Sequence, residues 1–265
     1  MMKKKKILII LSILLVVAFV WVLWGTLTVG LTKVTIREKN LPMAFHGYRI
    51  AHVSDLHNSH LWEETIKHLK KVKPDIICIT GDIVDVSRTD VDVAFAFCAE
   101  AVKIAPCYYV TGNHELGLNS AVYEKLISGL KALGVSVLNN EAVTLEMGDQ
   151  KIQLVGTGWG SASYGAEAFA YDGYRILLAH DPAHFESYTQ AGYDLVLSGH
   201  VHGGQFRLPL IGGLYGPGQG LFPDYETGVY SSGRTDMVVS RGIGNSVIPV
   251  RLNNRPEVIL ITLKT

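Results

Sequence analysis

Five short polar segments constrain this chain most, because each directly follows or ends an apolar run that predicts a β-strand. The ends of strands in a βα alternation gather at one edge of a sheet, so we expect the five segments to converge. Together they supply carboxylate oxygens, an amide oxygen and imidazole nitrogens, a ligand mixture that suits a pair of borderline divalent metals. The segments are Asp55–His57, Gly81–Asp85, Gly112–Glu115, His180 and Gly199–His202.

The remaining pattern predicts a layered α/β body. In its first half, predicted strands over Tyr48–Ser54, Asp75–Thr80 and Tyr108–Thr111 alternate with predicted helices over Trp62–Val72, Val91–Ile104 and Ala121–Leu133. The second half is mostly strand-like, which indicates two packed sheets with helices outside them. Its predicted strands are Val135–Leu138, Ala142–Glu146, Lys151–Val155, Arg175–Ala179, Leu195–Leu197, Met237–Ser240, Val247–Val250 and Val258–Leu263.

Each polar segment alone is a weak signal. Asp55 and His57 are separated by one residue, and in extended backbone two such side chains point to the same side. Gly81 permits a sharp turn, so the carboxylate of Asp82 projects from the strand end and can bridge two ions. Taken singly, these residues are better explained as turn residues, helix caps or solvated side chains.

The other segments add complementary ligands. Asn113 offers a neutral oxygen, and His114 beside it is placed to act on substrate rather than on metal. His180 ends one strand, while His200 and His202 share one side of extended backbone after another. A lone histidine after a strand is more often structural than a ligand, but five such sites in one chain rarely agree by chance. We therefore interpret the set as one metal centre.

The N-terminus predicts a membrane anchor. Lys3–Lys6 precedes Ile7–Trp24, eighteen residues of which only Ser12 is polar. As a helix this run spans roughly 27 Å, close to the thickness of the hydrocarbon core of a bilayer. Trp21 and Trp24 lie at its distal end, where aromatic rings favour the membrane interface. The lysines indicate a single-pass protein of the cell membrane with a cytoplasmic N-terminus and an extracytoplasmic body.

A cleaved signal peptide is the alternative. Its apolar region is normally shorter and is followed by a small-residue cleavage site, and no such site is found near residues 25–30. We therefore expect a lysine-rich tip and uncleaved anchor over residues 1–31, a polar linker over residues 32–40 and one catalytic domain over residues 41–265.

Charge and cysteine content narrow the function. Lysine plus arginine and aspartate plus glutamate number 24 each, which gives no support for a nucleic-acid partner bound through a general basic surface. An anionic substrate must then be held locally, by metals and loops. The three cysteines form no Cys-x-x-Cys pattern, so we expect buried free thiols and neither a structural zinc site nor a redox motif.

The order Asp-x-His, Gly-Asp-x-x-Asp, Gly-Asn-His-Glu, His, Gly-His-x-His resembles the calcineurin-like metallophosphoesterase superfamily, over Arg49 to about Gln205. Ser198–Gln205 and the tail Ser240–Leu263 resemble its bacterial membrane-associated branch, which includes relatives of UDP-2,3-diacylglucosamine pyrophosphatases. The resemblance implies an α/β fold, a four-layer αββα sandwich, preceded in this chain by the N-terminal transmembrane helix.

The resemblance also implies a division of ligands between two ions. One ion would take Asp55, His57, Asp82 and His202, and the other would take Asp82, Asn113, His180 and His200, with Asp82 bridging. His114 would be the catalytic residue that faces the phosphate and the leaving group. Asp85 and Glu115 match positions that orient the metal ligands from behind.

A centre of this kind predicts hydrolysis of phosphodiester or pyrophosphate bonds. Two ions about 3.5–4 Å apart share a hydroxide that attacks phosphorus in line, and they neutralise charge on the phosphoryl oxygens. A protonated His114 would stabilise that charge or protonate the leaving group. The ligand set contains no thiolate, so Mn, Fe and Zn all fit, and Mn is the first expectation.

The substrate is the property that the sequence constrains least. The glycine- and aromatic-rich stretches 157–174 and 211–230 are expected either as a rim over the site or as plain surface loops. Aromatic side chains beside an anchored domain favour an amphiphilic substrate, such as a lipid, a glycolipid or a nucleotide-sugar-lipid. The alternatives are a phosphomonoesterase acting on protein or small molecules and a non-catalytic scaffold, and the complete ligand set disfavours the scaffold.

Overall fold

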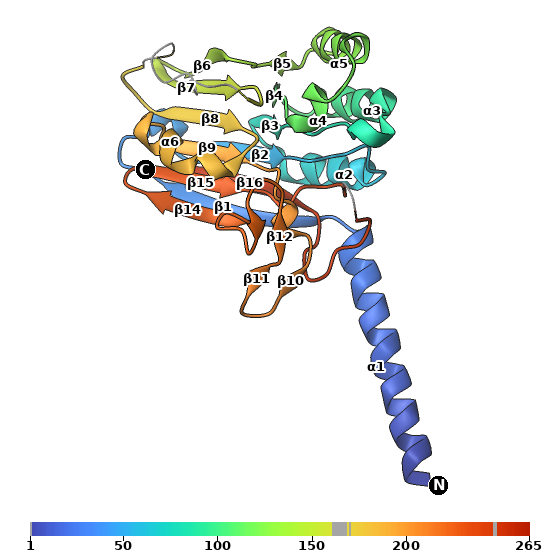
Figure 1. Cartoon of the computed structure of the whole chain (residues 1–265). Helices are drawn as coiled ribbons and strands as arrows, with labels where there is room; N and C mark the ends of the chain where they lie inside the picture. The colour runs from blue at the N-terminus through green and yellow to red at the C-terminus, as the bar shows by residue number, and fades with distance from the viewer. Residues whose placement is uncertain (1, 161–168, 170, 246–247) are drawn as a thin grey trace.

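The computed structural model describes residues 2–160, 169, 171–245 and 248–265, and its body is built on two six-stranded sheets (Figure 1). The first sheet has the order β1 (Gly30–Arg37), β16 (Glu257–Lys264), β2 (Arg49–Val53), β3 (Ile76–Thr80), β4 (Cys107–Val110) and β5 (Ser136–Val137). The second has the order β14 (Gly228–Ser232), β15 (Thr235–Val239), β9 (Leu195–Ser198), β8 (Arg175–Ala179), β7 (Gln150–Thr157) and β6 (Glu141–Met147).

The central strands of both sheets are parallel, which places their carboxyl ends at a common edge. In the first sheet β2, β3, β4 and β5 run parallel. In the second sheet β7, β8, β9 and β15 run parallel. The strands β16, β14 and β6 run antiparallel to their neighbours β2, β15 and β7. All five polar segments follow parallel strands, so the topology brings them to the same side of the sandwich.

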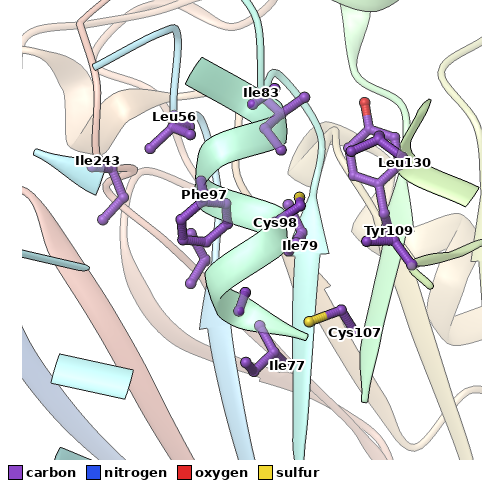
Figure 2. Packing of buried hydrophobic residues seen from close by; sticks show 14 of the residues in the cluster. Leu56, Ile77, Ile79, Ile83, Phe97, Cys98, Cys107, Tyr109, Leu130 and Ile243 are labelled. Carbon is purple, nitrogen blue, oxygen red and sulfur yellow. The ribbon is translucent and has the colours of Figure 1, made fainter. Parts of the chain in front are cut away.

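Helices cover the outer face of the first sheet. They are α2 (Trp62–Val72), α3 (Val91–Ala101) and α5 (Ser120–Ala132). Residues such as Leu69, Phe97 and Leu130 from these helices pack with Ile77 and Ile79 of β3 in one buried cluster. Figure 2 shows this cluster around Phe97, with the thiols of two cysteines among the apolar side chains. The free thiols of Cys78, Cys98 and Cys107 are all buried, in agreement with the expectation from the sequence.

A second buried cluster lies between the sheets, and a third lies under the helix on the far side. Ile76 and Cys78 of β3 face Leu178 of β8 and Leu197 of β9, because successive residues of a strand point to opposite faces. On the other face of the second sheet, Leu177 packs against α6 (Phe185–Gln190). The order helix, sheet, sheet, helix confirms the predicted αββα sandwich.

Smaller elements connect the main strands and helices, and several of them follow the carboxyl ends of the parallel strands. The helix α4 (Asn113–Leu116) follows β4. Two short hairpins pair β10 (Arg207–Leu208) with β11 (Gly212–Gly213) and β12 (Tyr215–Gly216) with β13 (Gly220–Leu221). The 3₁₀ turns are η1 (Met43–Phe45), η2 (Val86–Arg88), η3 (Pro182–His184) and η4 (His202–Gly204).

The helix α1 (Met2–Leu27) extends away from the body and carries the N-terminus (Figure 1). Residues 4–27 make it the one helix, within the part of the chain that the structure describes, whose length and apolar composition suffice to cross a membrane. Its C-terminal end is hydrogen-bonded to the body, since the hydroxyl of Thr26 donates to the carbonyl oxygen of Arg251 over 3.3 Å. The guanidinium of Arg255 lies 4.4 Å from the ring centre of Trp24.

Three expectations differ from the structure. The linker expected over residues 32–40 contains most of β1, which pairs in parallel with β16 from the far end of the chain. No strand forms over residues 248–250, where Pro249 has no N–H to donate, and Val247 lies outside the described residues. Part of the loop expected over residues 211–230 forms the short hairpins and β14. Of the stretch 157–174, residues 161–168 and 170 lie outside the described residues.

Candidate metal centre

The edge where the two sheets meet gathers the predicted ligands. Asp55 and His57 follow β2, and Asp82 follows β3 in the same sheet, while His180 follows β8 in the other sheet. All these side chains are buried, and so are His200 and His202 after β9. A buried set of carboxylates and imidazoles from two sheets needs mutual compensation of charge, because isolated buried ions are costly.

The backbone at these positions is left-handed, not extended. The angle φ is +53° at Asp55, +45° at His57 and +49° at Asp82. It is +69° at His200 and +50° at His202. The expectation that extended backbone aligns the paired ligands is therefore wrong, and tight turns do so instead. Residues other than glycine rarely adopt this conformation, and such strain is concentrated at functional sites.

Two glycines allow the turns to approach one another. Gly81 has a φ of +84°, and a Cβ atom there would lie 2.6 Å from Nδ1 of His180. A Cβ atom on Gly199 would overlap the Oγ atom of Ser54 and the carboxylate of Asp55. Larger residues at these two positions would separate the loops that carry the predicted ligands.

The first group of predicted ligands consists of Asp55, His57 and His202. Nε2 of His57 lies 3.1 Å from Nε2 of His202. Oδ1 of Asp55 lies 3.5 Å from Nε2 of His202 and 3.8 Å from Nε2 of His57. The carboxylate of Asp55 is oriented by the backbone N–H of His200, which donates to it over 3.1 Å.

The second group consists of Asp82, His180 and His200. Nδ1 of His180 lies 2.6 Å from the carbonyl oxygen of Thr80, which can only accept, so Nδ1 carries the proton. Once the ring is neutral, the lone pair is therefore on Nε2, which lies 3.1 Å from Oδ2 of Asp82. Fixing one ring nitrogen on a carbonyl so that the other is free to ligate is the usual arrangement of a metal-bound histidine.

Asp82 lies between the two groups. Its Oδ2 atom is 3.1 Å from Nε2 of His180 and 3.6 Å from Nε2 of His57. Oδ1 of the same carboxylate accepts from the backbone N–H of His114 over 2.9 Å. No other carboxylate in the two groups reaches imidazoles of both as closely, among the contacts of the described residues.

Asn113 completes the set with an unsatisfied oxygen. Its Oδ1 atom is buried and has no hydrogen-bond partner among the described residues. Leaving such an acceptor unpaired costs about 1–3 kcal/mol, and a cation would satisfy this oxygen, which belongs to the residue before His114, whose N–H binds Asp82. The donor set of imidazole, carboxylate and amide oxygens fits divalent metals of the Mn, Fe and Zn type.

The pKa values of the predicted histidine ligands agree with binding of a divalent metal. Burial lowers the pKa of His200 to about 4 and that of His202 to about 3, so both imidazoles are neutral and keep a lone pair at pH 7. Burial also acts to lower the pKa of His180, but the carboxylate of Asp82 outweighs it and raises the value to about 10. The Asp82–His180 pair therefore holds a proton that a cation has to displace.

Glu115 connects two of the loops from behind. It is fully buried, and Oε2 of its carboxylate accepts from the backbone N–H of Asp82 over 2.9 Å and of Gly112 over 2.7 Å. Oε1 accepts from the N–H of Val84 over 3.2 Å. Burial, with Asp82 nearby, raises the pKa of Glu115 to about 7. All three of these hydrogen bonds are donated by backbone N–H groups of the loops that carry predicted ligands, which suits an orienting role.

Asp85 and His114 lie beside His57. Oδ2 of Asp85 is 3.8 Å from Nδ1 of His57, and Oδ1 accepts from the N–H and the hydroxyl of Ser87. The rings of His57 and His114 are 4.5 Å apart between their centres. Nδ1 of His114 accepts from the N–H of Val86 over 3.0 Å, and Nε2 lies 4.0 Å from Oδ2 of Asp82. His114 is thus at the border of the ligand set, with Nε2 directed toward it.

Arg251, which was not predicted from the sequence as a site residue, contacts the metal centre from behind His202. Its side chain is fully buried. The Nη2 atom lies 3.4 Å from Nδ1 of His202 and also donates to the carbonyl oxygen of Gly244. Nη1 donates to the carbonyl oxygen of Arg241 over 2.6 Å, and Nε donates to Oδ1 of Asn245 over 2.8 Å. The only signal in the sequence was the resemblance of the tail, because a single arginine after an apolar run normally indicates a solvated charge.

A comparison with protein families agrees with this geometry. The model of the calcineurin-like phosphoesterase family matches residues 48–204, which include every predicted ligand. The chain belongs to the calcineurin-like phosphoesterase family. Members of this family are metal-dependent hydrolases of phosphoesters, so the chain is an enzyme of that class.

Several curated proteins are similar over most of the chain. An uncharacterized metallophosphoesterase of Bacillus subtilis, YkuE, is 34% identical, with 88% of this chain and 85% of that protein covered. The phosphodiesterase YaeI of Escherichia coli is 31% identical, with 82% of each chain covered. A bovine transmembrane protein with a metallophosphoesterase domain is 29% identical over 89% of this chain and 57% of its own length.

Proposed function

We propose that this chain is a membrane-anchored phosphoesterase that hydrolyses phosphodiester or pyrophosphate bonds in amphiphilic substrates at a centre of two divalent metals. The observation that carries the proposal is the position of Asp82 between two groups of buried ligands, with the unpaired oxygen of Asn113 in the loop whose His114 N–H binds Asp82. Asp55, His57, Asp82 and His202 would hold one ion, and Asp82, Asn113, His180 and His200 would hold the other. Mn²⁺ is the first candidate, and Fe and Zn are the alternatives.

A bound pair of divalent ions supplies an activated hydroxide and neutralises negative charge on a phosphoryl group. The chain's own contribution is positional. Glu115 and the left-handed turns hold the ligands in place before substrate arrives, so little reorganisation is needed during the reaction. Burial of the ligands excludes bulk water from the centre, which strengthens each electrostatic interaction there.

His114 would act on the substrate through Nε2. A backbone N–H can only donate, so Nδ1 of His114 is the acceptor from Val86 and the proton sits on Nε2. This neutral tautomer can donate to a phosphoryl oxygen or to the leaving oxygen without being protonated further. The sequence-based expectation of a charged His114 is replaced here by a neutral donor.

Two cavities beside the centre support an amphiphilic substrate. One of about 390 Å³ is lined by His57, His60 and Arg88, together with the end of α1. The other, of about 400 Å³, borders His202 and is lined mainly by Phe206, Tyr215, Pro217 and Ile248. A cavity of mixed polar and apolar lining and a largely apolar one on two sides of the same ligands suit a phosphoester with two unlike substituents.

The anchor is part of the same proposal. The C-terminal end of α1 is hydrogen-bonded to the body through Thr26 and Trp21, which suits a helix that is retained rather than cleaved. The lysines before the apolar run favour a cytoplasmic N-terminus, with the centre on the other side of the membrane. The name of the bovine relative, a transmembrane protein, supports attachment to a membrane.

The first experiment tests the metal centre. The full chain in detergent is stripped of metal, reloaded with Mn²⁺ and assayed on bis(4-nitrophenyl) phosphate, with bound metal measured by mass spectrometry. Asp82→Asn is expected to lower both bound metal and turnover, the latter by about 10³-fold or more. Asp149→Asn, an exposed residue in the turn after β6, is the matched control. Unchanged metal content and turnover in the Asp82 variant would refute the two-metal centre.

The second experiment tests the substrate class. Two aryl phosphodiesters that differ only in a methyl or an octyl substituent are compared, and the octyl ester is expected to have a kcat/KM about tenfold higher. Ile248→Ser in the apolar cavity should reduce that ratio. Equal kcat/KM values for both esters, or faster hydrolysis of phosphomonoesters, would overturn the amphiphilic diester assignment.

A further inference from the structure

A run of sixteen uncharged residues, 208–223, forms the two short hairpins beside the centre. Its large apolar side chains face outward: the exposed fraction is 108% for Leu210, 72% for Leu221, 60% for Ile211 and 59% for Phe222. Solvent-facing loops normally carry charges, and a patch of this kind marks a surface that meets another apolar phase.

The backbone holds two of these side chains in an unfavourable conformation. The angle φ is +69° at Leu210 and +55° at Phe222, in the left-handed region that bulky residues rarely adopt. Exposed bulky residues gain nothing from this conformation in water, because their side chains are not buried by it. Strain retained at an exposed apolar tip therefore indicates a contact made by the tip.

Hydrogen bonds connect this tip to α1. The indole N–H of Trp21 donates to Oδ1 of Asn253 over 2.9 Å. Nδ2 of Asn253 donates to the carbonyl oxygen of Arg207 over 3.2 Å, and Arg207 begins β10. The tip of the β10–β11 hairpin starts at the next residues. Figure 1 shows this hairpin projecting from the body toward the side on which α1 leaves it.

These bonds set the depth of the hairpin relative to the helix. Trp21 lies six residues before the end of α1 at Leu27, which is about 9 Å along the helix axis at 1.5 Å per residue. Trp21 is also inside the apolar run Ile7–Trp24 that would cross the bilayer. A hairpin bonded to the level of Trp21 therefore lies at the level where the membrane interface begins.

From this we infer that the tip formed by Leu208–Ile211, with Leu221 and Phe222, inserts into the bilayer interface as a second membrane contact. The inference rests on the proposed anchoring of α1 in a membrane. The occupant of the apolar tip is the lipid surface, because α1 and the hairpin leave the body on the same side and are joined through Asn253. Two contacts would fix the rotation of the body on the membrane and hold both cavities near the lipid headgroups.

Spin labels in the reconstituted full chain test the inference. Single cysteines replace Leu210 at the tip, Ile13 in α1 and Met147 in β6. The strand β6 is the edge of the second sheet opposite to β14. The native cysteines are buried, and the unsubstituted chain serves as the labelling control. In lipid vesicles, the labels at positions 13 and 210 should be relaxed by oxygen and protected from a water-soluble nickel chelate. The label at position 147 should show the reverse.

The outcomes separate the inference from the proposed function. If position 13 is in lipid and position 210 is open to the nickel chelate, the hairpin contact is wrong and the anchor stands. If positions 13 and 210 both respond to the nickel chelate, the anchor and the hairpin contact both fail. Dipolar broadening at position 210 that disappears on dilution with unlabelled chain would assign the tip to a second copy instead, and would also overturn the inference.

A functional measurement provides the second readout. The double variant Leu210→Glu, Ile211→Glu should lower turnover of a phosphodiester embedded in vesicles by about tenfold, because charged tips leave the interface. Its turnover of soluble bis(4-nitrophenyl) phosphate should match the unsubstituted chain, which shows that the variant is folded. Equal turnover of the embedded diester by the variant and the unsubstituted chain would refute the contact.

Discussion

The backbone N–H of Arg251 donates to the hydroxyl of Thr26 over 3.1 Å, while the guanidinium of the same arginine lies 3.4 Å from Nδ1 of His202. One residue thus contacts both the end of α1 and a predicted metal ligand. The same guanidinium binds the carbonyl oxygens of Arg241 and Gly244, and the N–H of Gly244 donates to the carbonyl oxygen of Asp55 over 2.7 Å. Arg251 therefore joins the loops on both sides of the first ligand group.

Replacing Arg251 by lysine should weaken metal binding without removing the charge. Lysine has no planar fork, so it cannot satisfy the carbonyl oxygens and the ring of His202 at once. Loss of an orienting contact of this kind is expected to raise the Mn²⁺ concentration needed for half-maximal activity by about tenfold. Arg234→Lys is the matched control, since Arg234, like Arg251, donates to a carbonyl oxygen but lies on the surface, where its other partner is the carboxylate of Asp194. A titration with the same midpoint in both variants would contradict the positioning role.

His114→Ala should slow substrates with poor leaving groups more than those with good ones. If Nε2 of His114 donates to the leaving oxygen, its removal matters most where that oxygen needs the proton. We expect a loss of about 10²-fold or more for an alkyl phosphodiester and a smaller loss for a nitrophenyl ester. Bound metal should remain unchanged, which distinguishes His114 from the ligands. Equal losses on both esters would assign the donor to a phosphoryl oxygen instead.

Glu115→Gln should destabilise the fold as well as the centre. The carboxylate accepts from three backbone N–H groups, and the amide nitrogen of glutamine would face at least one of them. An unsatisfied buried donor costs about 1–3 kcal/mol, so urea unfolding should show a loss in that range. Glu124→Gln on the exposed face of α5 should leave the free energy of unfolding unchanged. An unchanged free energy of unfolding and normal metal binding in Glu115→Gln would show that the loops keep their conformation without the Glu115 carboxylate.

Glu38, at the end of β1, gives a pH-dependent prediction away from the centre. Burial, with Asp236 and Asp194 nearby, raises the pKa of Glu38 from 4.5 to about 7. The folded state then binds the proton more tightly than the unfolded chain does. The charged form therefore costs stability: no cost is present below pH 4.5, it grows between pH 4.5 and 7, and it is complete above pH 7.

Glu38→Gln should accordingly raise Tm at pH 8 by about 1–2 °C and leave it unchanged at pH 4. The effect is small because the side chain is partly exposed and solvent screens its neighbours. Glu141→Gln, on exposed β6, is the control for loss of a surface charge. An equal rise in Tm at both pH values would show that the gain is not electrostatic.

The local hydrophobic pattern was sufficient to predict the bounds of elements that are strongly apolar along one face or throughout. The helix α2 begins and ends at the predicted residues, Trp62 and Val72, because its apolar positions recur at helical spacing. The strand β8 likewise matches Arg175–Ala179, an apolar run buried along its whole length. The strand β1 was missed because only Ile36 in it is buried, so its strand character comes from pairing with β16.

The chemical identity of the centre was readable for a different reason. Carboxylate, amide and imidazole groups at the ends of predicted strands are a property of residue type and spacing, and topology then brings parallel strand ends together. The orientation of these groups was not readable. Asp55 and His57 align through left-handed turns that depend on the close approach of Gly199 and Gly244, residues far away in the chain.

The layered fold, the apolar N-terminal helix and the kinds of ligand could be predicted from the sequence, because each depends on side-chain pattern over a few neighbouring residues, and the family resemblance implied the grouping of the ligands around Asp82. The left-handed turns at the ligands, the proton on Nε2 of His114 and the contacts of Arg251 with both α1 and His202 were visible only in the folded chain. These relationships join residues separated by as many as 225 positions, and hydrogen-bond geometry over such separations has no local signature in the chain.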